Sequence, residues 1–261
     1  MTVRRCNQLS WSQVNLYKNR CKYAWQLRYL EKRRPPKPQP MKFGIAFHNG
    51  AEHLLDDLYV TPKTTPETAI KNAQSYFGFN YSFDLKGPNT AKWLPIGEHM
   101  IGKLAENLLE MGDDFQLVST EQWVESFVRS RGELKFKMVG KVDCIARVQG
   151  ELTIIDWKTA SGMKYWSSGE EHEDMQLTGY QTLLLKEYPN PQLAYVITTK
   201  PQGMVHWLPT TRTLDQVKAF RRMVFLTHRE MEAATKFPKT TDPFICNWCD
   251  MKGHYCDGIA E

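Results

Sequence analysis

The chain has 261 residues, with 41% hydrophobic and 12% aromatic content and 34 Lys and Arg against 29 Asp and Glu. This length and apolar content exclude a disordered chain and allow a sizeable core, so we expect a single globular domain spanning residues 1–261. The surplus of five positive charges excludes a surface coated with positive charge but is compatible with a local basic groove.

Two further classes of protein are disfavoured. No segment approaches the roughly 20 apolar residues that a membrane span needs, and the first residues lack the apolar core of a signal peptide. We therefore expect a soluble cytoplasmic protein without a membrane partner. Six cysteines in a chain of this length do not make a disulfide framework, so their spacing is better examined for metal ligation.

The first part of the chain, residues 1–112, reads as mainly helical. Ser10 is predicted to be the N-cap of a helix or helical pair that ends in the basic, proline-rich stretch RRPPKPQP. Apolar residues at spacings of three and four predict further helices over residues 42–58, 66–79 and 94–111.

The central part, residues 113–237, changes to alternating and β-branched residues. It predicts an antiparallel meander of three strands over residues 117–128, 134–148 and 151–159. A helix over 172–188, strands over 192–200 and 204–209, and a helix over 213–236 follow. This order predicts a mixed α/β fold, with a central mixed β-sheet flanked by helices and a cysteine-containing tail over 238–261.

Two aspartates and a lysine follow the apolar parts of neighbouring strands. An antiparallel hairpin would bring Asp143 and Asp156 to the same end of the sheet. Lys158 points to the same face as Asp156, and Trp157 points to the other. Two carboxylates this close repel unless a cation lies between them, which favours a Mg²⁺ or Mn²⁺ site. Alone, Asp156 and Lys158 would be equally compatible with an exposed ion pair.

The order of several short motifs resembles the RecB-like branch of the PD-(D/E)XK nucleases. These motifs are Gly44-x3-His48-x3-Glu52, Gly140-x2-Asp143, Asp156-x-Lys158 and Gln176-x3-Tyr180. Each motif is weak alone, whereas their order and spacing together are specific. Val142 replaces the proline of the family's name, as is common in this branch. The resemblance extends from about residue 9 to the C-terminus and implies a restriction-endonuclease-like fold.

This resemblance also implies roles for individual residues. The metal ligands would be His48, Asp143, Asp156 and the backbone carbonyl of Trp157. Lys158 would position the attacking water. Gln176 and Tyr180 lie four residues apart on one helix face, so both would reach the scissile strand or the lysine.

Other interpretations of the same residues remain open. A histidine in an amphipathic helix is more often a packing or surface residue than a ligand, and this applies to His48. Tyr180 also fits a core stripe with neighbouring leucines. Glu52 and His53 fit a solvated helix surface equally well. Glu125 matches an acid often seen on the preceding strand, where its role is either catalytic or structural.

A cysteine group occupies the C-terminal tail. Cys246, Cys249 and Cys256 are three candidate thiolate ligands, and Cys21 in the first helical region is the candidate for the fourth. The same arrangement occurs in the iron-sulfur subset of this nuclease branch, which includes CRISPR-adaptation exonucleases and some helicase-nucleases. The resemblance therefore implies a structural [4Fe-4S] cluster that ties the tail to the N-terminal region. Structural Zn²⁺ is the alternative, because spacing does not separate the two metals.

Two cysteines stand apart from this group. Cys144 follows Asp143 on a strand and is expected to point to the opposite, buried face. Cys6 has no assigned partner.

Basic residues alternate with aromatic ones in KNRCKYAWQLRYLEKRR. Tyr23, Trp25 and Tyr29 are candidates to stack on unpaired bases while lysines and arginines contact phosphates. A packed helix with a solvated basic face explains the pattern equally well. No base-reading helix is apparent, so we do not expect sequence-specific recognition.

Taken together, these features favour a metal-dependent DNA exonuclease. It would act on single-stranded DNA or on DNA with free ends, in recombination, repair or replication. An iron-sulfur DNA-binding or assembly subunit with little catalysis, and a structure-specific endonuclease, are the alternatives.

Overall fold

A computed structural model describes residues 7–61, 63–82, 88–130 and 133–260. Cys6 lies outside these residues. No helix in the described part of the chain is both long and apolar enough to cross a membrane.

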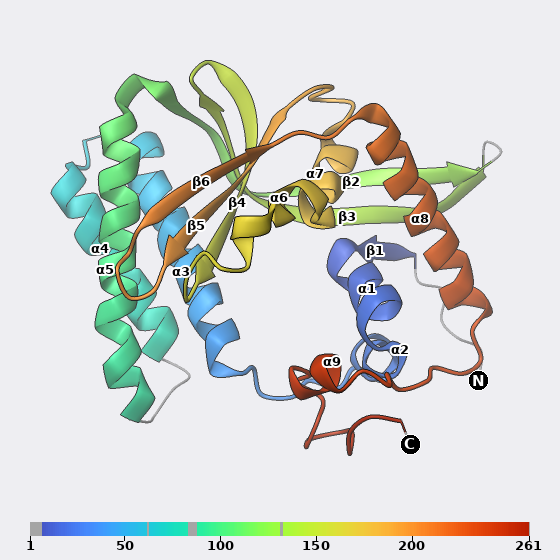
Figure 1. The fold of residues 1–261 in the computed structure, drawn as a ribbon. Helices are drawn as coiled ribbons and strands as arrows, with labels where there is room; N and C mark the ends of the chain where they lie inside the picture. The colour runs from blue at the N-terminus through green and yellow to red at the C-terminus, as the bar shows by residue number, and fades with distance from the viewer. Residues whose placement is uncertain (1–6, 62, 83–87, 131–132, 261) are drawn as a thin grey trace.

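A six-stranded mixed β-sheet forms the centre of the molecule (Figure 1). Its strands are β1 (Gln8–Ser10), β2 (Phe115–Ser130), β3 (Glu133–Val148), β4 (Glu151–Ala160), β5 (Gln192–Thr199) and β6 (Val205–Thr210). The strand order is β1-β3-β4-β5-β6, and β2 also pairs with β3. The pairs β1–β3 and β4–β5 are parallel, and the other pairs are antiparallel. The predicted antiparallel meander and mixed sheet are therefore confirmed.

The helices surround this sheet. They are α1 (Trp11–Asn15), α2 (Lys22–Trp25), α3 (Gln39–Leu55), α4 (Pro66–Ser82), α5 (Pro88–Met111), α6 (Glu170–Glu173), α7 (Met175–Leu184), α8 (Leu214–Ala233) and α9 (Pro243–Asn247). Single π-helical turns follow α1, α2 and α3. The predicted helices are confirmed, with two interruptions: the first region breaks at the extended Cys21, and the helix expected over 172–188 breaks at Asp174, which caps α7.

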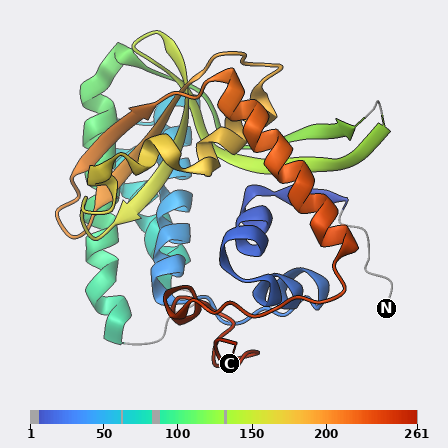
Figure 2. The ribbon, with the colours of Figure 1, turned by 45° about the vertical axis from the view of Figure 1, so that its right-hand side comes forward.

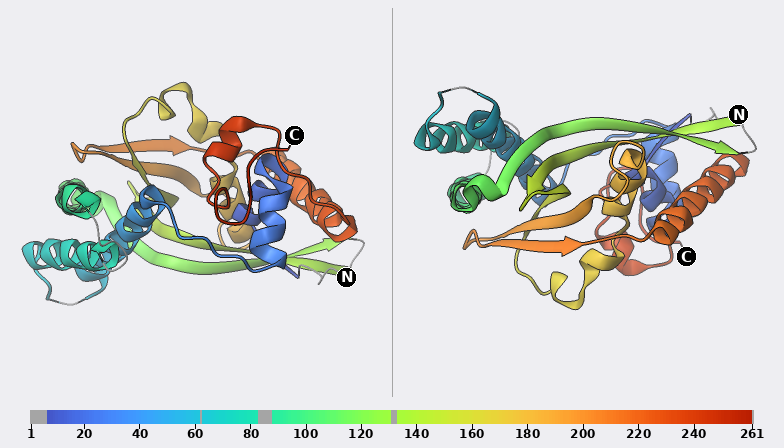
Figure 3. Two further views of the ribbon diagram at one scale, coloured as in Figure 1. Left: turned by 90° about the horizontal axis from the view of Figure 1, so that it is seen from below. Right: turned by 90° about the horizontal axis from the view of Figure 1, so that it is seen from above.

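Two apolar cores lie on opposite faces of the sheet. Helices α3, α4 and α5 cover one face, where they pack on Ile155 and Trp157 of β4. Helices α1, α7 and α8 contribute to the core of the other face, which contains Ile154. Figure 3 shows these helices on either side of the long strands β2 and β3. Asp156 and Lys158 follow Ile154 at two-residue spacing, so the strand presents them toward α7.

Strand β3 has one partner strand along one of its edges and two successive partners along the other. β2 pairs with it along its length, and the two strands form an arm that extends past α8 (Figure 2). On the other edge, β1 pairs with residues 137–139 and β4 with residues 144–148. The residues between these two stretches therefore face the gap between β1 and β4. Asp143 lies there, where β3 and β4 diverge.

Gly97 marks a close contact between α5 and α4. A Cβ atom at this position would lie 1.9 Å from Cζ of Phe77, which is completely buried. Replacing glycine with alanine inside a helix usually stabilises a protein by about 1 kcal/mol. We expect Gly97→Ala instead to lower the free energy of unfolding by about 2–4 kcal/mol, because the packed ring has to move.

Chemical denaturation tests this effect. Gly102→Ala in the same helix is the control, since its Cβ would meet only the end of the Gln74 side chain, at 3.2 Å. Equal stability of the two variants would show that the contact between α4 and α5 tolerates the extra methyl group.

Candidate active site

Asp143 links the two diverging strands through its side chain. Its Oδ2 atom accepts a hydrogen bond of 3.0 Å from the backbone N–H of Trp157 on β4. The carboxylate thus takes over the role of a backbone carbonyl at the point where the regular ladder ends. Asp143 is 8% exposed, and the hydrogen bond holds its carboxylate beside the backbone that carries Asp156.

Gly140 allows helix α7 to approach β3. A Cβ atom at this position would lie 2.8 Å from Cδ1 of Leu183 and 3.5 Å from Cε1 of Tyr180, so a larger residue would require the Leu183 side chain to move. A cavity of about 300 Å³ borders this contact, and its lining includes Trp11, Asn15, Gly140, Lys141, Gln176 and Tyr180. The glycine of the motif Gly140-x2-Asp143 therefore positions α7 close to the acidic residues.

Four of the predicted residues form one network. Lys158 Nζ pairs with Asp156 Oδ2 and donates to Gln176 Oε1 at 3.1 Å. The Gln176 amide donates to Asp156 Oδ1 at 2.6 Å and to the Tyr180 hydroxyl at 3.0 Å. Gln176 therefore fixes the orientation of the acid, the amine and the phenol together. The structure brings these side chains together from β4 and α7.

Burial changes the pKa values in this network. Asp156 is completely buried, and the loss of hydration raises its pKa, as does the charge of Asp143, against the opposing effect of Lys158. For Lys158, burial alone would lower the pKa, but the charge of Asp156 outweighs it and the pKa is raised. The lysine thus stays charged beside an acid whose ionisation is costly without a further cation.

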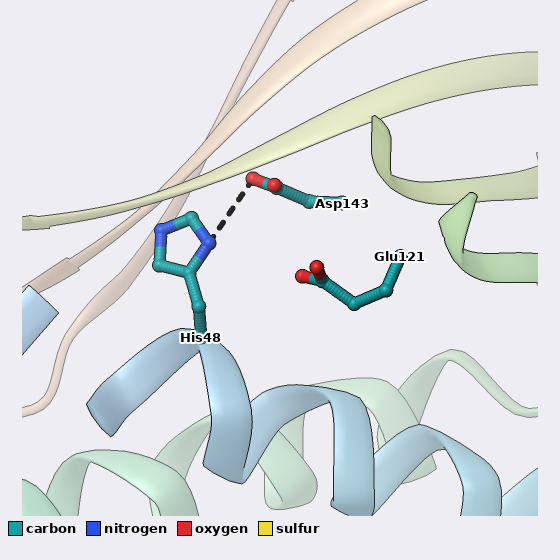
Figure 4. A group of neighbouring side chains, drawn as sticks. All are labelled: His48, Glu121 and Asp143. Carbon is teal, nitrogen blue, oxygen red and sulfur yellow. Dashed lines mark ion pairs between the residues drawn. The ribbon is translucent and has the colours of Figure 1, made fainter. Parts of the chain in front are cut away.

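His48 projects from α3 toward Asp143 (Figure 4). Its Nδ1 lies 3.3 Å from Asp143 Oδ2. Burial lowers the pKa of His48, but the hydrogen bond and charge of Asp143 raise it by more, so the net pKa is raised. Ligand atoms of His48, Glu121 and Asp143 all lie within 4.8 Å of one another. This combination of an imidazole and two carboxylates suits a divalent cation.

Glu121 was not among the predicted site residues. It lies on β2 between the paired positions Thr120–Cys144 and Gln122–Val142, and is therefore opposite Asp143. Its backbone φ of +46° is unusual for a residue other than glycine, and its carboxylate pairs with Lys141. No sequence signal identified it: counting back from the Ser130–Glu133 pair would place Glu121 opposite Val142, and only the register shift between Val128 and Arg129 brings it opposite Asp143.

The other acidic and histidine candidates lie outside the network. Glu125 accepts hydrogen bonds of 2.9 and 3.1 Å from Lys137 across the β2–β3 pair, as in a structural surface contact. His53 packs against the ring of Tyr76, with centroids 4.6 Å apart. Glu52 is half-buried. Its pKa is raised mainly by burial and, to a smaller extent, by the negative charge of Glu121.

The cysteine group converges on one small pocket. Cys21, Cys246, Cys249 and Cys256 all line it, which brings the first helical region and the tail together. Burial raises the pKa of the Cys249 thiol, while backbone N–H groups of Met251 and Lys252 favour the thiolate. In the described part of the chain no three of these sulfurs lie within 4.8 Å of one another.

Cys144 is completely buried in the core that α3, α4 and α5 cover, and Asp143 occupies the adjacent position on the strand. The prediction that Cys144 fills a core position is confirmed.

The expected stacking role of Trp25 is wrong. Its side chain is 1% exposed and packs between Tyr17 and Phe237, with ring centroids 5.3 and 5.5 Å away. Tyr29 packs against the same indole, and Tyr23 is partly buried. Trp25 and Tyr29 belong to the core to which α1, α7 and α8 contribute, whereas Tyr23 packs against a small separate cluster that contains Cys21.

Basic residues of the same region make internal ion pairs. Lys22 pairs with Glu230 of α8, and Arg28 with Asp250 of the tail. For Lys22 and Arg28, the pattern therefore reflects packing of this region against the C-terminal segments.

One family model agrees with the fold. The family model described as the PD-(D/E)XK nuclease superfamily matches residues 8–257. A solved structure titled "Crystal structure of SSO0001" is similar, with 15% identity, a TM-score of 0.45, and coverage of 95% of this chain and 85% of that chain. A search of curated proteins produced no match. Since the family model spans nearly the whole chain, the protein belongs to the PD-(D/E)XK nuclease superfamily.

Proposed function

We propose that this protein is a Mg²⁺- or Mn²⁺-dependent DNA exonuclease of the RecB-like branch, acting on single-stranded DNA or DNA ends in recombination, repair or replication. The observation that carries the proposal is the network of Asp156, Lys158, Gln176 and Tyr180 beside Asp143. An ion pair with a purely structural role would need neither an amide that orients both partners nor a phenol beside them.

The cation would be held by His48, Asp143, Asp156 and the backbone carbonyl of Trp157. Glu121 adds a carboxylate to the His48 and Asp143 side of this group. The donors are carboxylate, carbonyl and imidazole groups, which suit Mg²⁺ or Mn²⁺. When bound, the cation would act as a Lewis acid that polarises the phosphoryl oxygen and makes water a better nucleophile.

The protein's own groups orient the reactants. The Lys158 ammonium, anchored by Asp156 and Gln176, stays protonated and offsets negative charge that builds on the phosphate in the transition state. Gln176 and Tyr180 keep the lysine and the acid in a fixed arrangement, so little reorganisation is needed when the substrate binds.

The cysteine pocket would hold a structural [4Fe-4S] cluster. Support comes from the convergence of four cysteines from the two ends of the chain on one pocket. The cluster would fasten the tail to the first helical region. Its reduced thiolate ligands are consistent with a cytoplasmic location.

Cleavage assays test the proposed function. Purified protein is incubated with end-labelled linear single-stranded DNA, linear duplex DNA and circular single-stranded DNA, each with Mg²⁺, Mn²⁺ or EDTA. We expect the linear single strand to be shortened from its ends only when a divalent cation is present. Cleavage of the circle would instead identify an endonuclease, and tight binding without turnover would identify a DNA-binding subunit.

The affinity for Mn²⁺ is expected to depend on pH. Burial, and secondarily Asp143, raises the pKa of Asp156 to about 6. Since the ionised carboxylate is the ligand, Mn²⁺ affinity should be full above this value and fall as the pH drops below it. Calorimetric titration with Mn²⁺ between pH 5 and 8 measures this. An affinity that does not change over this range would show that Asp156 is not a ligand.

A further inference from the structure

A large groove lies next to the candidate active site. It has a volume of about 740 Å³ and lies between α1 with its following turn, the segment before α7, and the tail helix α9. Its lining includes Asn15, Asn19, Arg20, Tyr165, Phe244 and Trp248. Figure 1 shows α9 at the bottom of the molecule, near α1 and α2.

Three aromatic rings of this groove are unusually exposed. Phe244 and Trp248 are each 72% exposed, and Tyr165 is 61% exposed. Phe244 and Trp248 lie 6.5 Å apart between centroids, with an angle of 57° between their planes, so neither ring covers the face of the other. Large exposed aromatic residues gathered in a groove mark a binding surface.

The groove continues into the candidate active site. Trp11 and Asn15 line both the groove and the 300 Å³ cavity that contains Gln176 and Tyr180. Asp174 belongs to the groove wall, and its Oδ1 accepts hydrogen bonds from the Gln176 backbone N–H at 2.7 Å and from the Tyr195 hydroxyl at 2.6 Å. A flexible chain with its reactive linkage at Gln176 would therefore pass directly into the groove.

The cysteine pocket and the groove share one short helix. In α9, Cys246 points inward and is 4% exposed, while Phe244 and the following Trp248 reach the groove. Fixing Cys246 and Cys249 therefore also fixes the two rings beside them. This gives the cysteine pocket a direct connection to the shape of the groove.

The groove has the chemistry of a site for unpaired nucleotides. Every base has a face that stacks on an aromatic ring, which makes such binding tolerant of sequence. Arg20 supplies a positive charge for a phosphate, and Asn15 and Asn19 supply amide groups. A peptide partner would not explain why the groove opens at the network that contains Lys158.

We propose that this groove binds the unpaired bases of a single DNA strand whose scissile linkage lies at the candidate active site. The proposal rests on the proposed function and names the part of the substrate that the chain holds away from the cut. Phe244, Trp248 and Tyr165 stack on bases, and Arg20 contacts the backbone.

Binding assays in EDTA test this without cleavage. Fluorescence anisotropy measures the affinity of the full chain for a labelled oligothymidylate. Phe244→Ala and Trp248→Ala are each expected to raise the dissociation constant roughly tenfold, and Trp248→Phe to have a much smaller effect because it keeps a ring. Phe79→Ala is the matched control, since Phe79 on α4 is 64% exposed and lies outside the groove. Unchanged affinity in both alanine variants would overturn the proposal.

Photocrosslinking of the unaltered protein gives a second test that does not depend on the folding of variants. An oligonucleotide containing bromodeoxyuridine is expected to crosslink to the peptide that contains Phe244 and Trp248. Crosslinks confined to other peptides would overturn the proposal. A protein that binds through the groove but cleaves no DNA would count against the proposed nuclease function alone, whereas cleavage with unaffected ring variants would count against the groove alone.

Discussion

Replacing Asp156 with asparagine is expected to lower the rate of Mg²⁺- or Mn²⁺-dependent DNA hydrolysis by about a thousandfold. The side chain is completely buried and contacts both Lys158 and Gln176. Asparagine keeps the size and one acceptor oxygen but removes the negative charge that would bind the cation. Initial rates on linear single-stranded DNA at saturating Mn²⁺ measure the loss.

Glu125→Gln is the matched control for this substitution. It removes one acidic charge from β2, where Glu125 pairs with Lys137 and not with the network. We expect a rate within about twofold of the unaltered protein, because surface ion pairs contribute little. Equal rates for Asp156→Asn and the unaltered protein would place the chemistry elsewhere. A large loss in Glu125→Gln would instead assign that acid a role in the site.

Replacing Cys246 with serine is expected to remove the proposed [4Fe-4S] cluster and release the tail. Cys246 is nearly fully buried in the cysteine pocket, and binding of a structural metal commonly contributes about 10 kcal/mol or more to the folded state. The variant should lose iron and visible absorbance and unfold at a temperature lower by about 10 °C or more. Iron analysis, absorption spectra and calorimetry measure these changes.

The control for the cysteine substitution is Cys144→Ala. Cys144 is also completely buried but lies in the core that α3, α4 and α5 cover. We expect this variant to lose some stability and to keep its full iron content. A colourless unaltered protein that contains stoichiometric zinc would contradict the iron-sulfur assignment, and a metal-free protein of unchanged stability would contradict any structural metal.

The sheet could be predicted from local patterns, whereas the residues of the network were expected from the order and spacing of motifs that resemble the family. Alternation of apolar residues places Asp156 and Lys158 on one face, and a spacing of four places Gln176 and Tyr180 on one helix face. The hydrogen bonds of Gln176 confirm that these faces meet. Tyr180 also belongs to the core to which α1, α7 and α8 contribute. Its ring therefore packs in this core while its hydroxyl accepts a hydrogen bond from Gln176.

The features that could not be predicted depend on tertiary contacts. Strand β1 has three residues, too few for a periodic pattern, and exists because it pairs with β3. The helix break at Asp174 depends on Tyr195, which donates a hydrogen bond to its side chain. Trp25 was a candidate to stack on bases, with packing as the equal alternative, and Phe237 from beyond α8 covers the ring.

The position of Glu121 depends on a strand register that alternation does not determine. A register shift between Leu117 and Ser119 changes which residue of β2 faces Asp143. A second register shift lies between Val128 and Arg129, and counting from the Ser130–Glu133 pair without it would place Thr120 opposite Asp143. Glu121 and Glu125 lie four residues apart on one face of the strand, so alternation does not distinguish them. The structure places Glu121 beside His48 and Asp143.

Anomalous diffraction from crystals soaked in Mn²⁺ tests most directly whether Asp143 and Asp156 share one divalent cation. We predict a manganese peak within coordination distance of both carboxylates and of His48. A peak that contacts Asp143 but not Asp156, or no peak in this region at saturating Mn²⁺, would contradict a shared cation.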